Sequence, residues 1–387
     1  MNKSWWKSKD ELDNDQKAFI GLPPHGKHLL IGPPGSGKTN LLLLRAQFMA
    51  GSGEKNVLIV TYSKELADFI RSGIGGTGLI SGRQVKTYHS WACDHILQHL
   101  GQFAVPKGSD FDDETRTKIY EQLLLANQKL PSPKLFSAIF VDEAQDLTSG
   151  ELDALIGLSD NICICGDERQ GIYNRDGLDV AAKHDLAVHK LTRHFRIGQK
   201  IAHIADRLMP PSDGTESLEA TSNYNPKEQG ESSAKMHLCA SRDDQFQTMI
   251  ALIRIQLDAF KGDTVGIFCG PRETAKELRE RFNGTDLNTS VCVHKVDEEA
   301  SFSGTCPIHV LTIHSSKGAE FRAVHLFGTE DLLNWPFNRS RLSFTAITRA
   351  KTALNAYGTG ETNKQLENAF SKPTHFDIDD LFPTGAK

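Results

Sequence analysis

Short apolar runs alternate with amphipathic stretches along most of the chain. In the first half, buried-strand patterns fall at five places: residues 29–31, 57–63, 85–88, 135–146 and 161–170. Between them lie stretches with apolar residues at helical spacing. Apolar strands that alternate with helices predict a mostly parallel sheet wrapped by helices. The first half therefore has the pattern of an α/β layer structure.

The second half repeats this construction without repeating the sequence. Strand patterns fall at residues 236–241, 264–270, 290–295, 308–316 and 323–328. Helical patterns fall at residues 244–257, 273–282 and 341–354. We therefore expect a second, similar α/β layer structure, which agrees with a length of 387 residues, since single cores of that size usually divide into two domains.

Composition shifts divide the chain into five segments. Residues 209–234 are rich in Pro, Gly, Ser and Glu, which favours a linker between two domains. We expect an N-terminal segment, a first lobe with a small helical insert, the linker, a second lobe and a C-terminal tail: residues 1–27, 28–208 with the insert at about 93–134, 209–234, 235–360 and 361–387. The tail mixes acidic and apolar residues, as docking peptides and frayed termini both do.

A glycine-rich segment, GPPGSGKT at residues 32–39, directly follows the first strand pattern and precedes a helical one. This is the G-x-x-x-x-G-K-[ST] pattern in its strand–loop–helix context. Glycines let backbone N–H groups curl around phosphate oxygens, and the helix N-terminus faces the same phosphates. The predicted nucleotide-binding residues here are Gly32, Gly35, Ser36, Gly37, Lys38 and Thr39. Lys38 is expected to reach the β- and γ-phosphates, and the Thr39 hydroxyl to hold Mg²⁺.

Two acidic residues end the strand pattern at residues 135–141. In a parallel sheet the ligand lies at the carboxyl ends of the strands, where the phosphate loop also lies. Asp142 is therefore a predicted second anchor for Mg²⁺, and Glu143 is placed to orient or deprotonate an attacking water. The expected cofactors are ATP and Mg²⁺.

Charge and composition exclude few classes of function. A net charge of −5 neither favours nor excludes nucleic acid, which needs only a local basic groove. Seven cysteines are scattered without a C-x-x-C pair, so a zinc or redox site is not indicated, and Cys163 and Cys165 are expected to be buried thiols. No run is long enough for a membrane span, and the N-terminus lacks a signal-peptide pattern, so we expect a cytoplasmic protein.

The segment VDEAQD, taken with GPPGSGKT, resembles the UvrD/Rep-type superfamily 1 DNA helicases. The resemblance extends over most of the chain, with the matching segments LDNDQKA, VTYSKELA, TYHSW, CGDERQGIY, LTRHFR, TIHSSKGAEF and FTAITRAK. It implies two RecA-like lobes with ATP in the cleft between them. The family's long accessory insertions are mostly missing here, so the chain resembles a minimal form.

The resemblance also implies roles around the nucleotide. Gln16 would read the adenine edge, and Asn40 stands where the family usually has a basic residue against adenine. Gln170 and Arg196 would contact the γ-phosphate, and Phe195 would stack on adenine. In the second lobe, Gly318 would lie near the γ-phosphate, Glu320 on the ribose, and Arg349 would be the arginine finger. Arginines from both lobes would stabilise charge only when the lobes close, because arginine is always charged and binds phosphate bidentately.

A second set of residues is implied to hold single-stranded nucleic acid. The family places base or backbone contacts on segments that match the following residues: Thr61, Tyr62, Thr87, His89, Tyr173, Arg175, Thr312, His314 and Ser315. Arg175 stands where the family has a base-stacking aromatic residue. A guanidinium plane can also stack on a base.

Taken together, these patterns predict an ATP-dependent DNA helicase or translocase with catalytic residues Lys38, Glu143, Gln170, Arg196 and Arg349. Single-stranded DNA would stimulate ATP hydrolysis, and the family implies 3′-to-5′ movement and strand separation in DNA repair, replication, recombination or defence. The alternative is a regulatory ATPase switch in a nuclease or defence complex, with a protein partner and little processive unwinding. A small-molecule kinase is disfavoured, because it would not need the acidic motif or arginines from a second lobe.

Overall fold

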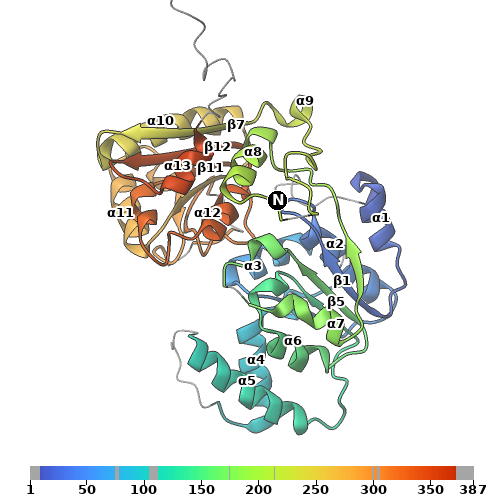
Figure 1. Cartoon of the computed structure of the whole chain (residues 1–387). Coiled ribbons are helices and arrows are strands. Elements are labelled where there is room, and N and C mark those ends of the chain that lie inside the picture. Colours follow the sequence, from blue (N-terminus) through green and yellow to red (C-terminus); the bar gives the residue numbers. More distant parts are fainter. Residues whose placement is uncertain are drawn as a thin grey trace, which may run out of the picture.

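The computed structural model describes residues 9–371 apart from 75–77, 104–111, 174, 213, 299 and 303–305. Within this part, the chain forms two six-stranded, fully parallel sheets, each wrapped by helices, and the two layered bodies lie side by side (Figure 1). The predicted fold class, two α/β lobes, is therefore confirmed. We call the body with the first sheet the first lobe and the body with the second sheet the second lobe.

The first sheet has the strand order β3-β2-β4-β5-β1-β6. Its strands are β1 (Lys27–Ile31), β2 (Val57–Thr61), β3 (Val85–Thr87), β4 (Ala138–Val141), β5 (Ile162–Gly166) and β6 (Ala187–Lys190). The helices before and between them are α1 (Asn14–Ile20), α2 (Lys38–Gly51), α3 (Lys64–Gly73), α4 (Tyr88–Leu100), α5 (Asp113–Gln128), α6 (Ser149–Ile156) and α7 (Val180–Lys183). β2, β4 and β5 are buried along their whole length, as their continuous apolar runs require.

The second sheet has the order β7-β12-β11-β8-β10-β9. Its strands are β7 (Ser233–Cys239), β8 (Val265–Cys269), β9 (Val291–Val293), β10 (Ile308–Thr312), β11 (Phe321–Leu326) and β12 (Ala350–Thr359). Its helices are α8 (Gln199–Leu208), α9 (Pro226–Gln229), α10 (Arg242–Ala259), α11 (Arg272–Asn283), α12 (Ser340–Ile347) and α13 (Lys364–Phe370). Short 3₁₀ turns complete the chain: η1 (Lys9–Glu11), η3 (Gly82–Gln84), η4 (Ala144–Asp146), η5 (Glu168–Gln170), η6 (Gly177–Asp179), η7 (Asn288–Ser290) and η8 (Thr329–Leu333).

One predicted helix is partly wrong. We expected a helix over residues 341–354, but α12 ends at Ile347 and the chain continues as β12 from Ala350. β12 is an inner strand between β7 and β11, and every residue but its last is buried. A segment that is covered on all sides carries no polar face, so its sequence lacks the period that separates a strand from a helix.

The position of α8 bears on the boundary between the lobes. Its apolar residues lie in the same core cluster as side chains of β8, β10 and β11, and α8 packs on α13. We therefore propose that the second lobe begins before α8, although the sequence pattern placed this helix in the first lobe. Residues 209–234 also pack on the second lobe: the buried Tyr224 hydroxyl lies 3.0 Å from the Thr352 hydroxyl.

The insert in the first lobe is a helical hairpin. It consists of α4 and α5, which pack on each other and, through α5, on α6. Figure 1 shows the hairpin at the end of the first lobe that points away from the second lobe. The Asn127 side chain on α5 donates to the Ala154 carbonyl on α6 at 2.9 Å, which fixes the hairpin to α6.

The cysteines follow the expected pattern with one addition. Cys163 and Cys165 are buried on β5, as predicted, and have free thiols. Cys292 and Cys306 form a disulfide bond that the sequence pattern did not indicate. Across the described residues, the helices are all too short or too polar to cross a lipid bilayer.

Candidate functional site

The glycine-rich segment forms a tight loop between β1 and α2. Gly35 and Gly37 adopt positive φ angles of 77° and 87°, which side chains other than glycine rarely allow. A Cβ on Gly32 would lie 2.8 Å from the Ser36 hydroxyl oxygen, so only glycine fits there as well. The loop leads directly into the first turn of α2 at Lys38. Its backbone therefore has the shape of a phosphate cradle at a helix N-terminus.

Lys38 and Thr39 stand at the opening of this cradle. The Lys38 ammonium donates to the Gly32 and Pro33 carbonyls at 2.8 and 3.0 Å and lies 3.9 Å from the Asp167 carboxylate. The Thr39 hydroxyl donates to the Asp142 carboxylate at 2.7 Å. The structure thus brings together the two predicted metal-binding oxygens, which are 103 positions apart in the sequence.

The Thr39–Asp142 pair fits a magnesium ion. Burial, and then the charge of Glu143, raises the pKa of Asp142 to about 7. A cation bound beside this carboxylate would stabilise its ionised form. The described residues contain no cluster of three or more His, Cys, Asp or Glu side chains that could hold a metal. Mg²⁺ bound with a nucleotide needs only one or two protein oxygens, since phosphates and waters supply the rest. When bound, the ion would neutralise charge on the phosphates.

Glu143 follows Asp142 at the end of β4 in a left-handed backbone conformation, with φ at 55°. Its carboxylate accepts a hydrogen bond from the Gln145 side chain. Burial alone would raise the pKa of Glu143, but the charges of Lys317, Arg349 and Lys38 outweigh it and hold the pKa below its usual value. Glu143 is therefore ionised, which a group that accepts a proton from water requires.

Gln16 is fixed beside the loop by the cap of α1. Asp13 and Gln16 form a capping box at the start of this helix. The buried Gln16 amide then donates to the Ser36 carbonyl at 2.8 Å. Its carbonyl oxygen accepts from the Asp13 N–H in the helix cap, so the structure ties Gln16 to the loop through its amide nitrogen.

Of the two predicted arginines, Arg196 lies against the loop, and Arg349 lies among the acids that follow β4 and β5. A Cβ on Gly35 would lie 3.3 Å from the Cβ of Arg196, which places this arginine against the loop. Burial, and then the charge of Arg349, lowers the pKa of Arg196, so the two guanidinium groups sense each other. Arg349 is 3% exposed, and Glu143 is the strongest of the carboxylates that act on its pKa. Arg196 also forms an ion pair with Glu320 of the second lobe.

The remaining nucleotide-site residues are distributed as follows. The Gln170 amide donates to the Thr348 hydroxyl at 3.1 Å, which joins the first lobe to the residue before Arg349. The Phe195 backbone N–H donates to the Gly35 carbonyl at 3.2 Å, and its ring is half-buried. Asn40 is half-buried in the first turn of α2. Gly318, with φ at 81°, packs against Leu66 of α3, on the side where the nucleic-acid residues lie.

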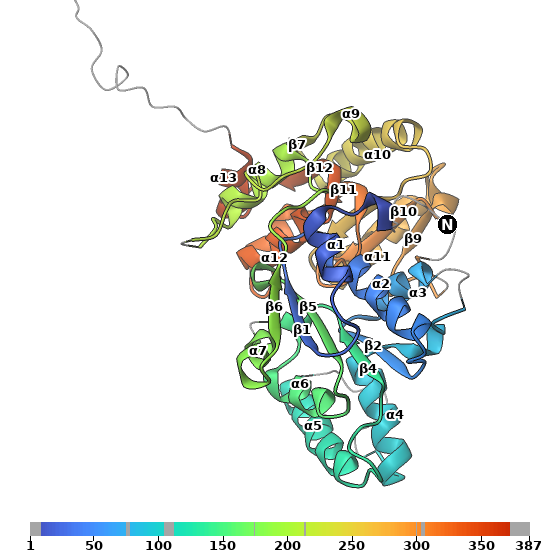
Figure 2. The ribbon, with the colours of Figure 1, turned by 90° about the vertical axis from the view of Figure 1, so that its right-hand side faces the viewer.

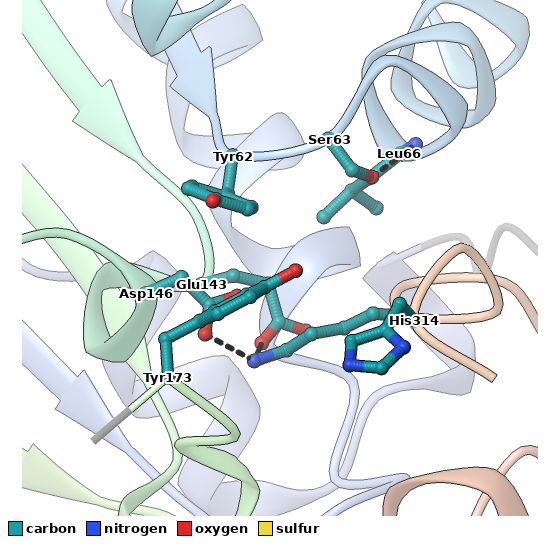
Figure 3. Close-up of a pocket in the computed structure, with 8 residues that line it drawn as sticks. Tyr62, Ser63, Leu66, Glu143, Asp146, Tyr173 and His314 are labelled. Atoms are coloured by element: carbon teal, nitrogen blue, oxygen red, sulfur yellow. Dashed lines mark hydrogen bonds and ion pairs between the residues drawn. The ribbon is translucent and has the colours of Figure 1, made fainter. Parts of the chain in front are cut away.

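Five of the predicted nucleic-acid residues form one aromatic and cationic cluster beside Glu143. The Tyr62 and Tyr173 rings lie 4.9 Å apart, and the His314 ring of the second lobe lies 6.5 Å from Tyr173. His89 meets Tyr62 edge-on at 5.8 Å, and Arg175 lies over the Tyr173 ring at 5.3 Å. Figure 3 shows the pocket that this cluster opens onto, with tyrosines of the first lobe facing the histidine of the second. Its lining residues are Tyr62, Ser63, Leu66, Glu143, Asp146, Tyr173, His314 and Lys317. We call this cluster and pocket the aromatic groove.

The predicted threonines and serine are less exposed. Thr61 is fully buried at the end of β2, an inner strand of the first sheet. Thr87 caps α4 by accepting from the Ser90 N–H at 3.2 Å. The Thr312 hydroxyl bonds to the buried Ser315 at 3.2 Å. Thr87 thus caps the helix that carries His89, and Thr312 and Ser315 bond to each other on either side of His314.

Lys317 is the residue that the sequence interpretation missed. Its ammonium is 3% exposed and lies 2.6 Å from the Asp146 carboxylate, 2.8 Å from the Gln170 carbonyl and 3.6 Å from the Glu143 carboxylate. It therefore joins the second lobe to Glu143 and Asp146, two of the acids that follow β4. Its position in the sequence could have pointed to it, because Lys317 lies between Ser315, a predicted nucleic-acid contact, and Gly318, a predicted nucleotide contact.

Comparisons with known proteins agree with this geometry. A family profile described as "AAA domain" matches residues 16–176, and one described as "UvrD-like helicase C-terminal domain" matches residues 307–357. The two matches support the resemblance of this chain to the UvrD/Rep-type superfamily 1 helicases. Among individual proteins it is similar to F-box DNA helicase 1 of Gallus gallus, with 32% identity over 112 residues.

This chain matches only a part of each of these relatives. The similar segment is 28% of this chain and 11% of the Gallus gallus protein. A solved structure described as "The structure of PRRSV helicase" covers 88% of this chain and 54% of its own, with 16% identity and a TM-score of 0.41. The family profiles include the glycine-rich loop in one match and Arg349 in the other.

Proposed function

We propose that this chain is an ATP-dependent DNA helicase or translocase, in which single-stranded DNA stimulates ATP hydrolysis. One observation carries the proposal. The ionised Glu143 lies between a phosphate cradle in the first lobe and the buried Arg349 of the second, and on its other side it lines the aromatic groove. A single carboxylate thus borders both the nucleotide site and the strand site.

The coupling follows from the way the two lobes share both sites. Lys38 from the first lobe and Arg349 from the second would bind the phosphates together, so nucleotide binding draws the lobes together. Tyr173 and His314, which face each other across the same seam, would hold a strand from both sides. Closing and opening of the lobes would then shift one grip along the strand relative to the other.

The family resemblance supports more specific features of this function. We propose Mg²⁺ held by Thr39 and Asp142, movement in the 3′-to-5′ direction, a preference for DNA over RNA, and a cytoplasmic role in DNA repair, replication, recombination or defence. The similar protein of Gallus gallus is named a DNA helicase, which supports DNA as the substrate. Gln16, Asn40, Phe195, Gly318 and Glu320 remain proposed nucleotide contacts.

A strand-displacement assay tests the proposal. The protein alone is given ATP, Mg²⁺ and duplexes with a 3′ tail, a 5′ tail or no tail, in DNA and RNA forms. We expect displacement of the 3′-tailed DNA duplex, and none by the Glu143→Gln variant. ATP hydrolysis that does not depend on the length of single-stranded DNA would favour the regulatory switch instead. ATP hydrolysis that no nucleic acid changes would overturn both.

A further inference from the structure

Arg116, on insert helix α5, reaches out of the hairpin and into the wall of the aromatic groove. It is 5% exposed. One of its nitrogens lies 3.2 Å from His89 Nε2 and 3.4 Å from the Tyr62 hydroxyl, and its guanidinium carbon lies 5.6 Å from the centre of the Tyr62 ring. Its other terminal nitrogen forms an ion pair with the buried Glu151 of α6. No sequence pattern pointed to this residue.

These contacts fix two groove residues at once. Arg116 has donors and no acceptor, so His89 Nε2 must accept and the ring carries its proton on Nδ1. Burial, and then the charge of Arg116, lowers the pKa of His89 to about 3, which agrees with a neutral ring. The guanidinium carbons of Arg116 and Arg175 lie 5.6 and 6.0 Å from the centre of the Tyr62 ring. Both rings therefore have one orientation before a ligand arrives.

We propose that Arg116 is a positioning residue for the aromatic groove, so that the α4–α5 hairpin sets the affinity for unpaired nucleic acid. The inference rests on the proposed function, because it concerns the same groove. A hairpin that served only to cover the sheet would need the Arg116–Glu151 ion pair but not the contacts to Tyr62 and His89. The ion pair with Glu151 thus holds in place the Arg116 nitrogen that contacts Tyr62 and His89.

The test separates positioning from folding. Arg116→Met alone would leave Glu151 buried without a counter-charge, so the main variant is Arg116→Met with Glu151→Gln, which keeps an acceptor for the Thr148 N–H. Lys118→Met, an exposed position on the same helix, is the matched control. Readouts are the thermal unfolding midpoint, ATP hydrolysis without nucleic acid, and the Kd for a 20-nucleotide thymidine oligomer.

We expect the double variant to fold and to keep its basal ATP hydrolysis, while its Kd for the oligomer rises about tenfold, the loss typical of one disturbed base-stacking contact. The His89 ring should also lose its single tautomer, as seen by nitrogen NMR of labelled histidine. A folded double variant that binds the oligomer as tightly as the wild type overturns the inference. If the wild type binds no oligomer, the proposed function fails first, and this inference falls with it.

A second observation concerns Trp335, whose side chain is 79% exposed. It stands on a turn closed by the Phe337 N–H, which donates to the Asn334 carbonyl at 2.9 Å. The Phe337 ring packs edge-on against His314 at 5.8 Å. The Arg339 guanidinium donates hydrogen bonds to the Pro336 carbonyl of the turn and, at 2.9 Å, to the Ile172 carbonyl of the first lobe. The turn is therefore anchored at the rim of the aromatic groove.

We infer that Trp335 stacks on a nucleobase that emerges from the groove, because a fixed, exposed indole at the edge of a strand site offers a flat face that every base can cover. The sequence has four tryptophans, so fluorescence tests this in protein that carries Trp5→Phe and Trp6→Phe, where the only other indole is that of Trp91, which is 3% exposed. Addition of the thymidine oligomer should quench this protein, and the further change Trp335→Phe should abolish most of the quenching. Trp335→Ala should raise the Kd severalfold. If Trp335→Phe leaves the quenching unchanged and Trp335→Ala leaves the Kd unchanged, Trp335 does not stack on a base.

Discussion

Replacement of Lys317 by methionine tests how the second lobe acts on the acids of the first. The Lys317 ammonium contacts Asp146 at 2.6 Å and Glu143 at 3.6 Å, and Asp146 is fully buried. Methionine keeps the length of the side chain but removes the charge. Two consequences follow, one for stability and one for the pH dependence of ATP hydrolysis.

The loss of stability can be worked from these contacts. Breaking a buried ion pair by removing one partner costs about 3–5 kcal/mol, because the other charge stays buried. Burial, only partly offset by Lys317, already raises the pKa of Asp146 to about 6, and without Lys317 this carboxyl can take up a proton instead. We therefore expect a loss near the lower limit, about 3 kcal/mol at pH 7. In Lys317→Met the folded state then binds more protons than the unfolded state. The loss of stability relative to the wild type should therefore shrink as the pH falls towards 6.

The pH dependence of the rate should move as well. Among the charges that lower the pKa of Glu143, that of Lys317 is the strongest, so its removal raises this pKa. A base must be ionised to accept a proton, and the acid limb of the kcat profile should therefore move to higher pH.

Two measurements check both effects: urea unfolding at pH 6, 7 and 8, and the pH profile of kcat. Both are made on the wild type, on Lys317→Met, and on the double variant Lys317→Met with Asp146→Asn. The double variant leaves no unpaired charge at the Asp146 site and should recover most of the stability. Lys183→Met, which breaks an exposed ion pair with Asp153, should change nothing measurable. A Lys317→Met protein as stable as the wild type, with an unshifted profile, would refute the reasoning.

Three further predictions follow from single positions. Glu143→Gln should reduce ATP turnover by orders of magnitude while nucleotide binding persists, as measured by turnover and by titration with a fluorescent ATP analogue; full turnover would contradict the site. His325 is buried with its pKa lowered to about 3, so below pH 6.5 the unfolded state binds the extra proton and the wild type should lose about 2 kcal/mol between pH 7 and 5 through this group. Urea unfolding of His325→Gln should lack that part of the slope, whereas exposed His203→Gln should keep it. Gly177→Ala would place a Cβ 2.2 Å from the Ala144 carbonyl oxygen and should cost at least about 2 kcal/mol; an unchanged urea midpoint would contradict the close packing.

The phosphate loop and the strand-end acids could be predicted because their chemistry lies in short contiguous motifs. Gly35 and Gly37 need their conformation locally, and Asp142 follows its strand directly, so the parallel sheet alone brings it to Thr39. The same holds for Tyr62 and Tyr173, each of which follows a strand of the first sheet.

Contacts between distant segments could not be predicted in this way. Lys317 meets Asp146 across 171 positions, and Arg116 meets Tyr62 across 54. Neither pair has a local pattern, since each exists only after helices and sheets have packed. Burial was equally hidden: Thr61 matched a nucleic-acid segment, but it lies at the end of an inner strand and is fully buried.

The most direct measurement of the central claim is steady-state ATP hydrolysis by the purified chain, with and without single-stranded DNA of increasing length. If Glu143 borders both sites as proposed, DNA should raise kcat at saturating ATP, and the stimulation should grow with DNA length before it levels off. Lys38→Ala should abolish the signal. Hydrolysis by the wild type at one rate, whatever the DNA, would contradict a motor that couples the two sites.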